Sequence, residues 1–240
     1  MDTIKISDKK NVKFIAHRGV SGLERENTNA AFVAAGNRTY FGIETDIHKT
    51  LDGNFVIIHD DTTARVAIDN LTVEQSTFET LRSLTLLDMD GKKSRSDLKL
   101  PTLEEYISIN KKYDKVAVLE LKNAFEEEDV YAICDRINAL EYLDKTIFIS
   151  FCYDNLVYLR KKYPNAAAQF LVSKYTDDLI DRLKEHNFDL DIKHSALNAE
   201  NVAALKAAGI TINCWTVDDP ARAEELISFG VDMITTNILE

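Results

Sequence analysis

Seven charged or histidine side chains stand at the ends of short apolar segments, where a purely structural strand would carry apolar or turn residues. They are His17, Arg18, Glu44, Asp46, His59, Glu120 and Lys122. If the three carboxylates converge, a cation or protons must compensate their charge, and ligand sets made only of oxygen favour Mg²⁺ or Ca²⁺ over Zn²⁺. Arginine and lysine suit phosphate recognition, and two histidines suit a paired general base and acid. Together these residue types fit phosphoester chemistry at a metal centre.

The spacing of these side chains indicates which of them share a face. Glu44 and Asp46 are two residues apart in one segment, and so are Glu120 and Lys122 in another. Because the side chains of a strand alternate between its two faces, each pair lies on one face. Taken singly, such a pair is equally well explained by a solvated edge strand or a structural ion pair. Their joint occurrence at several strand ends favours a functional site.

Nine short β-rich segments alternate with amphipathic helical stretches, which is the pattern of βαβ units around a parallel sheet. The predicted strands are Lys13–His17, Gly42–His48, Asn54–His59, Lys115–Leu121, Thr146–Phe151, Ala167–Val172, Phe188–Ile192, Thr211–Val217 and Val231–Thr236. The predicted helices include Pro101–Tyr113, Glu126–Leu140, Asp154–Lys162, Thr176–His186, Ala199–Ala208 and Pro220–Phe229.

Two of the predicted strands cannot both belong to a parallel barrel. Gly42–His48 and Asn54–His59 are separated by only Lys49–Gly53, which ends in the turn dipeptide Asp52-Gly53. A parallel connection needs about a dozen residues, so these two segments are predicted to be antiparallel neighbours. The other eight predict an α/β fold, a (β/α)₈ TIM barrel with a small hairpin insertion after its second strand. In such barrels the active site lies at the carboxyl ends of the strands.

The overall composition limits the classes of protein to consider. The chain has 240 residues, which suits one barrel of typically about 250 residues. Its net charge of −11 argues against broad nucleic-acid binding, which needs many Lys and Arg. No apolar segment approaches the roughly 18–20 residues of a membrane span, and no apolar signal region is visible at the N-terminus. With three cysteines and no CxxC spacing, we expect a reduced, cytoplasmic protein. The oligomeric state stays open.

Short motifs continue in a fixed order along nearly the whole chain. They are His17-Arg18-Gly19, Glu26-Asn27-Thr28, Ala30-Ala31-Phe32, Glu44-x-Asp46, Thr50-x-Asp52-Gly53, His59-Asp60, Pro101-Thr102-Leu103-Glu104-Glu105, Glu120-Leu121-Lys122, Ser150-Phe151, Trp215-Thr216-Val217 and Gly230-Val231-Asp232. In this order the chain resembles the glycerophosphodiester phosphodiesterase family, within the phosphatidylinositol-phospholipase-C-like barrel group. No single motif is decisive, but the ordered set is highly specific.

The resemblance implies hydrolysis of a small-molecule glycerophosphodiester to glycerol 3-phosphate and an alcohol, with a divalent metal ion, Mg²⁺ or Ca²⁺, as cofactor. The implied roles are metal binding for Glu44, Asp46 and Glu120, acid/base catalysis for His17 and His59, phosphate binding for Arg18 and Lys122, and an apolar substrate contact for Trp215. It also implies one domain over residues 1–240, with an insertion at about 60–100 that carries glycerol-end contacts.

The chain departs from the family pattern in three places. Arg25 replaces a usual Pro, Arg65–Asn70 replaces a familiar stretch of the insertion, and the usual Asp and Pro are absent around Asn237. The alcohol and the glycerol specificity therefore stay open. The sequence also does not divide the roles between the two histidines. His48 and His194 are weaker candidates for contact with the site. Two other functions fit the same residues: a lyase that releases a cyclic phosphate, and a non-catalytic glycerophosphodiester-binding protein. A sugar-phosphate aldolase or isomerase is suggested by the fold alone.

Overall fold

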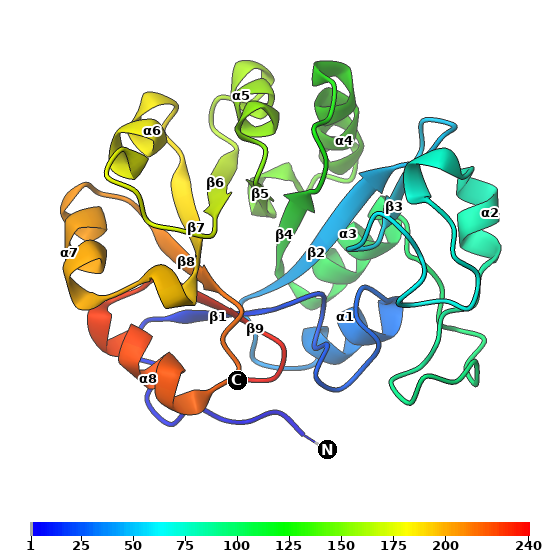
Figure 1. Ribbon diagram of the computed structural model, residues 1–240, viewed down its shortest axis with the longest axis horizontal. Coiled ribbons are helices and arrows are strands. Elements are labelled where there is room, and N and C mark those ends of the chain that lie inside the picture. Colours follow the sequence, from blue (N-terminus) through cyan, green and yellow to red (C-terminus); the bar gives the residue numbers. More distant parts are fainter. Residues whose placement is uncertain (1) are drawn as a thin grey trace.

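Eight parallel strands form a closed barrel in the computed structural model, which describes residues 2–240 (Figure 1). The strands are β1 (Lys13–Ala16), β2 (Gly42–Lys49), β4 (Val116–Leu121), β5 (Thr146–Ser150), β6 (Ala167–Val172), β7 (Asp189–Lys193), β8 (Ile212–Trp215) and β9 (Met233–Thr236). Strand β1 pairs with β9 on one side and with β2 on the other, which closes the ring. The predicted barrel is therefore confirmed.

The ninth strand, β3 (Phe55–Ile57), runs antiparallel to β2, with His48 opposite Val56. Gly53 lies in the connecting turn with φ 75°, a left-handed conformation that glycine adopts without steric cost. The hairpin predicted from the short Asp-Gly connection is confirmed. It carries His59 to the same end of the barrel as the ends of the parallel strands.

Helices surround the strands on the outside of the barrel (Figure 1). They are α1 (Asn29–Gly36), α3 (Leu103–Tyr113), α4 (Glu127–Ala139), α5 (Tyr153–Lys162), α6 (Leu179–Glu185), α7 (Ala199–Ala207) and α8 (Pro220–Phe229). Local sequence fixes several of their ends: Thr102 and Glu105 form a capping box at the start of α3, and Asp219 caps α8 directly before Pro220. Within residues 2–240, none of the helices combines the length and apolar character needed to span a membrane.

Apolar side chains fill the space between strands and helices, and a second, smaller cluster fills the barrel itself. The inner cluster comprises Ile15, Val118, Ile147, Ile149, Leu171 and Met233. Above it the strands end in the polar residues singled out from the sequence. The tightly packed apolar interior thus supports the polar residues at the strand ends.

Residues 60–100 lie beside the barrel, between β3 and α3, and have their own apolar cluster (Figure 1). They contain the short 3₁₀ helix η1 (Val73–Gln75), the helix α2 (Phe78–Ser83) and one isolated antiparallel bridge between Thr62 and Thr72. The helix α2 was not among the elements expected from the sequence. Two further 3₁₀ turns, η2 (Leu143–Lys145) and η3 (His194–Ala196), connect elements of the barrel.

Candidate active site

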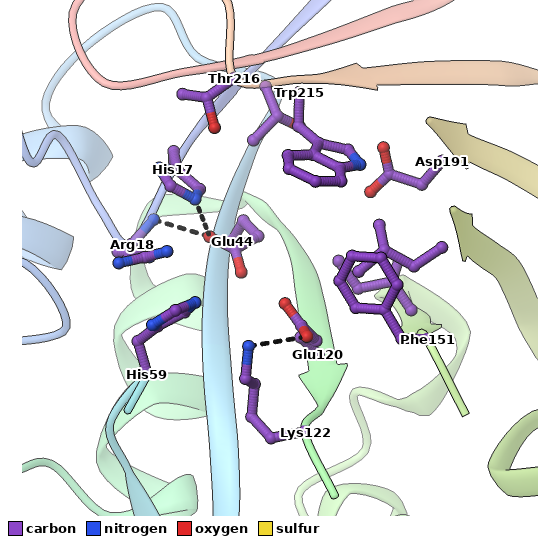
Figure 2. A pocket seen from close by; sticks show the side chains of 13 residues that line it. His17, Arg18, Glu44, His59, Glu120, Lys122, Phe151, Asp191, Trp215 and Thr216 are labelled. Carbon is purple, nitrogen blue, oxygen red and sulfur yellow. Dashed lines mark hydrogen bonds and ion pairs between the residues drawn. The ribbon is translucent and has the colours of Figure 1, made fainter. Parts of the chain in front are cut away.

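One pocket opens at the carboxyl ends of the barrel strands, and seven of the eight predicted site residues line it (Figure 2). The eighth, Asp46, is fully buried beside them. The pocket has two unlike sides. The charged wall is formed by His17, Arg18, Glu44, Asp46, His59, Glu120 and Lys122. The apolar wall is formed by Ile149, Phe151, Leu171 and Trp215, with Asp191 among them.

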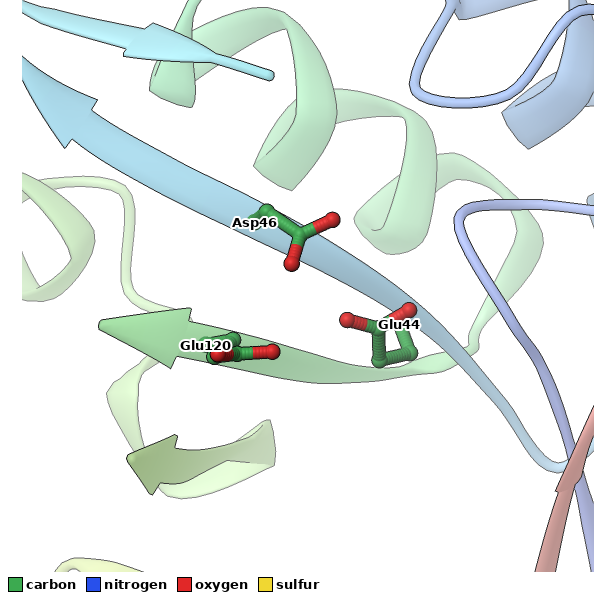
Figure 3. Close-up of side chains that lie close together, drawn as sticks. All are labelled: Glu44, Asp46 and Glu120. Atoms are coloured by element: carbon green, nitrogen blue, oxygen red, sulfur yellow. The ribbon is translucent and has the colours of Figure 1, made fainter. Parts of the chain in front are cut away.

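Three carboxylates meet in the charged wall, from the neighbouring strands β2 and β4 (Figure 3). One oxygen each of Glu44, Asp46 and Glu120 lies within 4.8 Å of the other two. Burial and the charge of Asp46 raise the pKa of Glu44 well above its ordinary value and that of Glu120 to about 7. Burial also opposes ionisation of Asp46, but Arg18 and Lys122 outweigh it and hold its pKa well below the usual range.

The carboxylates are held in place by neutral donors as well as by charges. Asn27 Nδ2 donates to Asp46 Oδ2 at 2.7 Å, while Thr45 Oγ1 donates to Asn27 Oδ1 at the same distance. The backbone N–H of Arg18 donates to Glu44 Oε2 at 2.8 Å. Thr28, which follows Asn27, accepts a bond from the backbone of Ala31 and so caps α1. The Glu-Asn-Thr motif thus positions a metal-ligand candidate and starts a helix.

Arg18 is held in an unusual backbone conformation, with φ 53°. Non-glycine residues rarely adopt this left-handed region, and such strain concentrates at functional sites. In this conformation the backbone N–H of Arg18 donates to Glu44. Its guanidinium lies 2.8 Å from Glu26 and 3.5 Å from Asp46. The next residue, Gly19, approaches α1 so closely that a Cβ would lie 2.6 Å from the Ala31 side chain. A glycine is therefore required there.

His17 is oriented by a chain of hydrogen bonds through Asn237, which directly follows the last strand. Its Nδ1 lies 2.7 Å from Asn237 Oδ1, and Asn237 Nδ2 donates to Asp218 Oδ2 at 2.6 Å. Because the amide nitrogen of Asn237 is committed to Asp218, its oxygen accepts the Nδ1 proton of His17. Burial, and then the Arg18 charge, lower the pKa of His17 to about 4. The imidazole is therefore neutral, and its unprotonated Nε2 lies 4.0 Å from Glu44 Oε2.

His59 is held in a similar way by its neighbour in sequence. Its Nδ1 donates to Asp60 Oδ1 at 2.6 Å, and Asp60 Oδ2 accepts from Arg65 at 2.6 Å. Arg65 also pairs with Glu26 at 2.5 Å, which links this histidine to Arg18. His48 lies behind His59, 3.2 Å from its backbone oxygen, and does not line the pocket.

The residues of the charged wall fit a divalent cation. Three buried carboxylates stand together, and the two cations beside them, Arg18 and Lys122, offset only part of their charge. Lys122 Nζ lies 2.9 Å from Glu120 Oε1 and 3.4 Å from Asp46 Oδ1. A hard divalent cation would remove the remaining repulsion, and it is the kind of ion that takes oxygen ligands alone.

The apolar wall is built differently. Phe151 and Trp215 stack edge to face, with ring centroids 5.8 Å apart, above the barrel interior. Among them Asp191 on β7 is only 2% exposed, and burial raises its pKa well above the ordinary value. Sequence reasoning had placed Trp215 here but had not singled out Asp191, which looks like an ordinary strand residue.

Several residues that orient the site were also missed by sequence reasoning. Glu26 and Asp60 lie within recognised motifs, so only their roles were unknown. Arg65 and Asn237 lie in segments noted only as departures from the family, and Asp218 lacks any local signal. His194 was weighed as a head-group contact, but it accepts a bond from Arg222 and does not line the pocket.

Comparison with known proteins identifies the family of the chain. The model of the glycerophosphoryl diester phosphodiesterase family matches residues 17–240, and the chain belongs to that family. Among curated relatives, the glycerophosphodiester phosphodiesterase of Caldanaerobacter subterraneus subsp. tengcongensis is 30% identical over 233 residues, which is 93% of this chain and 93% of the relative. The resemblance seen in the ordered motifs is confirmed.

Solved structures give the same result for the fold. A phosphodiesterase from Oleispira antarctica in complex with the product sn-glycerol-3-phosphate has a TM-score of 0.85 and 28% identity, and the match covers 94% of this chain and 92% of that one. A glycerophosphodiester phosphodiesterase from Parabacteroides distasonis has a TM-score of 0.78 and 30% identity, with 95% and 93% covered.

Proposed function

We propose that the chain hydrolyses glycerophosphodiesters to glycerol 3-phosphate and an alcohol, with a divalent cation held by Glu44, Asp46 and Glu120. The observation that carries the proposal is the convergence of these buried carboxylates with two histidines and two cationic side chains in one pocket. Membership of the family supports the reaction class. The product bound to the Oleispira antarctica relative supports a glycerol phosphate as one of the two products.

The charged wall would receive the phosphate group of the substrate. When bound, a divalent cation would polarise the phosphoryl group and lower the pKa of a neighbouring hydroxyl group. Its oxygen-only ligands favour Mg²⁺ or Ca²⁺. Arg18 and Lys122 lie beside the carboxylates and would stabilise the negative charge on the non-bridging oxygens.

The two histidines would move the protons. His17 is neutral with an unprotonated Nε2, so we assign it as the base that removes the proton of the attacking hydroxyl. His59, whose Nδ1–H is held by Asp60, would act in its doubly protonated form and give the Nε2 proton to the departing alcohol. A new P–O bond forms to the attacking oxygen, and the P–O bond to the alcohol breaks. The attacking hydroxyl is water or the 2-hydroxyl of the glycerol, and only the second gives a cyclic phosphate.

The rest of the chain would serve the same reaction. We propose that residues 1–240 act as one catalytic domain and that the insertion at about 60–100 contacts the glycerol end, because its Arg65 reaches the charged wall through Glu26 and Asp60. Trp215 would contact the carbon atoms of the substrate from the apolar wall.

A diester panel tests the reaction. Purified protein is incubated with glycerophosphocholine, glycerophosphoethanolamine, glycerophosphoglycerol and glycerophosphoinositol, each with Mg²⁺, Ca²⁺ or EDTA, and glycerol 3-phosphate and cyclic glycerol phosphate are measured. We expect metal-dependent release of glycerol 3-phosphate from at least one diester. A cyclic phosphate as the final product would establish the lyase instead, and no product from any diester would favour the non-catalytic binding protein.

A further inference from the structure

The apolar wall contains two buried polar atoms that no side chain or backbone group of residues 2–240 satisfies. They are Asp191 Oδ1 and the indole nitrogen of Trp215, Nε1. Both residues line the pocket, and in Figure 2 the indole nitrogen lies on the side of the ring that faces Asp191. Buried polar groups are nearly always hydrogen-bonded, so two adjacent exceptions in one pocket indicate a group that the substrate brings.

The neighbouring polar residues do not supply the missing partners. Asn213 lies opposite Asp191 in the sheet register. Its Nδ2 donates to Gln169, and its Oδ1 accepts from Thr235 at 3.1 Å. These amide and hydroxyl groups bond to one another, and Asp191 lines the pocket without a partner for its Oδ1.

The types of the two unpartnered atoms restrict what can bind there. Trp215 Nε1–H can only donate, so it disfavours an ammonium group, whereas Asp191 Oδ1, where it acts as an acceptor, needs a donor that an anion lacks. A hydroxyl group is both donor and acceptor and satisfies the two together. Burial raises the pKa of Asp191 well above its ordinary value, and its protonated carboxyl can donate or accept. Phe151 and Leu171 beside it would contact carbon atoms.

We infer that Asp191 and Trp215 form a hydroxyl-binding subsite that selects the polyol part of the substrate. This inference rests on the proposed function for the position of the phosphate, at the charged wall. The phosphate and the subsite then recognise different parts of one molecule. The hydroxyl belongs to the glycerol or to the alcohol head group, and the two sources are separable by experiment.

Calorimetric binding to the Mg²⁺-loaded protein tests the subsite with two ligands, sn-glycerol 3-phosphate and propyl phosphate, which lacks both hydroxyl groups. Trp215→Phe removes the Nε1–H but keeps an aromatic ring against Phe151, and Asp191→Leu removes the carboxyl. Each is expected to weaken binding of glycerol 3-phosphate about tenfold while propyl phosphate changes less than about twofold. Asp191→Asn, which keeps hydrogen-bonding atoms, should retain most of the preference for glycerol 3-phosphate over propyl phosphate.

The control variant is Asp189→Asn. Asp189 lies on the same strand as Asp191, but its carboxylate accepts from the backbone N–H of Thr211 and does not line the pocket. This variant should leave both affinities unchanged. If only the head group uses the subsite, glycerol 3-phosphate binding will not change. Trp215→Phe will then raise KM for glycerophosphoinositol but not for glycerophosphocholine, which has no head-group hydroxyl.

The inference would be overturned if the variants weakened binding of both ligands equally. It would also be overturned if no ligand affinity and no KM for a diester changed, since water alone would then occupy the subsite. Failure of the proposed function gives a different result. The wild-type protein would hydrolyse no diester, while the preference for glycerol 3-phosphate over propyl phosphate and its loss in Trp215→Phe would remain. Because Trp215→Phe is a conservative change, the test does not depend on whether Asp191→Leu folds.

Discussion

In the charged wall Arg18 and Lys122 form ion pairs with Asp46 and Glu120, whereas Asp191 in the apolar wall has no ion pair in the described part of the chain. The first arrangement fixes reacting groups before a substrate arrives, which is how electrostatic catalysis avoids reorganisation. The second leaves hydrogen-bonding capacity for the substrate itself. One side of the pocket is therefore organised for the reaction and the other for selection of the substrate.

The largest effect is expected from the carboxylates, because they act on metal and phosphate together. Glu44→Gln keeps the shape of the side chain but removes its charge, and should lower kcat/KM about a thousandfold or more. Calorimetry should show weaker Mg²⁺ binding in the same sample. Glu127→Gln, a helix-surface carboxylate paired with Lys161, is the control and should remain active. Activity of Glu44→Gln within tenfold of wild type would mean that the carboxylates have another purpose.

A smaller effect is expected where a residue acts through a histidine. Asn237→Ala removes the acceptor for Nδ1–H of His17 and should lower kcat about 10- to 100-fold, with KM changed less. Ser21→Ala removes a different bond to the same Asn237 oxygen and should cost much less. Steady-state kinetics of both variants check this. Equal losses in the two would show that Asn237 is merely structural.

The raised pKa values predict how pH affects the metal-free protein. Glu120 has a pKa of about 7 in the folded state, against an ordinary pKa of 4.5. Between pH 4.5 and pH 7 its carboxyl is therefore protonated in the folded protein but deprotonated in the unfolded chain. The folded state therefore holds more protons between those values, and stability falls as pH rises through that window. A bound cation needs the deprotonated carboxylates, so Mg²⁺ should raise Tm more at pH 8 than at pH 5.

Thermal unfolding with Mg²⁺ and with EDTA between pH 5 and pH 8 measures this linkage. For a chain of this size, each kcal/mol of linked binding energy shifts Tm by about 2–4 °C. The same Mg²⁺ stabilisation at both ends of the pH range would contradict the assignment of the buried carboxylates as ligands.

The smallest effect is expected in the apolar wall. Phe151, which is 45% exposed, contributes mainly its edge-to-face contact with Trp215. Phe151→Leu should raise KM by about two- to fivefold and leave kcat nearly unchanged. The contrast with Asn237→Ala, which acts on kcat, distinguishes the two walls kinetically. A large fall in kcat here would remove that distinction.

The two walls also differ in how far the sequence could predict them. The charged wall was predictable because its residues lie within apolar strands or directly after them, and a parallel barrel brings all strand ends to one rim. The orienting residues were not, because Asn237 meets His17 from 220 positions away and only the closure of β9 on β1 brings them together. Asp191 was missed because nothing in a strand sequence tells whether a carboxyl has a partner. The helix α2 was missed because the insertion lacks a long periodic pattern.

The most direct test of the account compares chemistry and metal binding in one variant. His59→Ala leaves all three carboxylates in place but removes the proposed proton donor. If the histidine pair transfers the protons, the single-turnover rate of glycerol 3-phosphate release falls at least about a hundredfold in this variant, while the Kd for Mg²⁺ stays within about threefold of wild type. An unchanged rate would contradict this role, because the charged wall would then perform the reaction without the histidine pair.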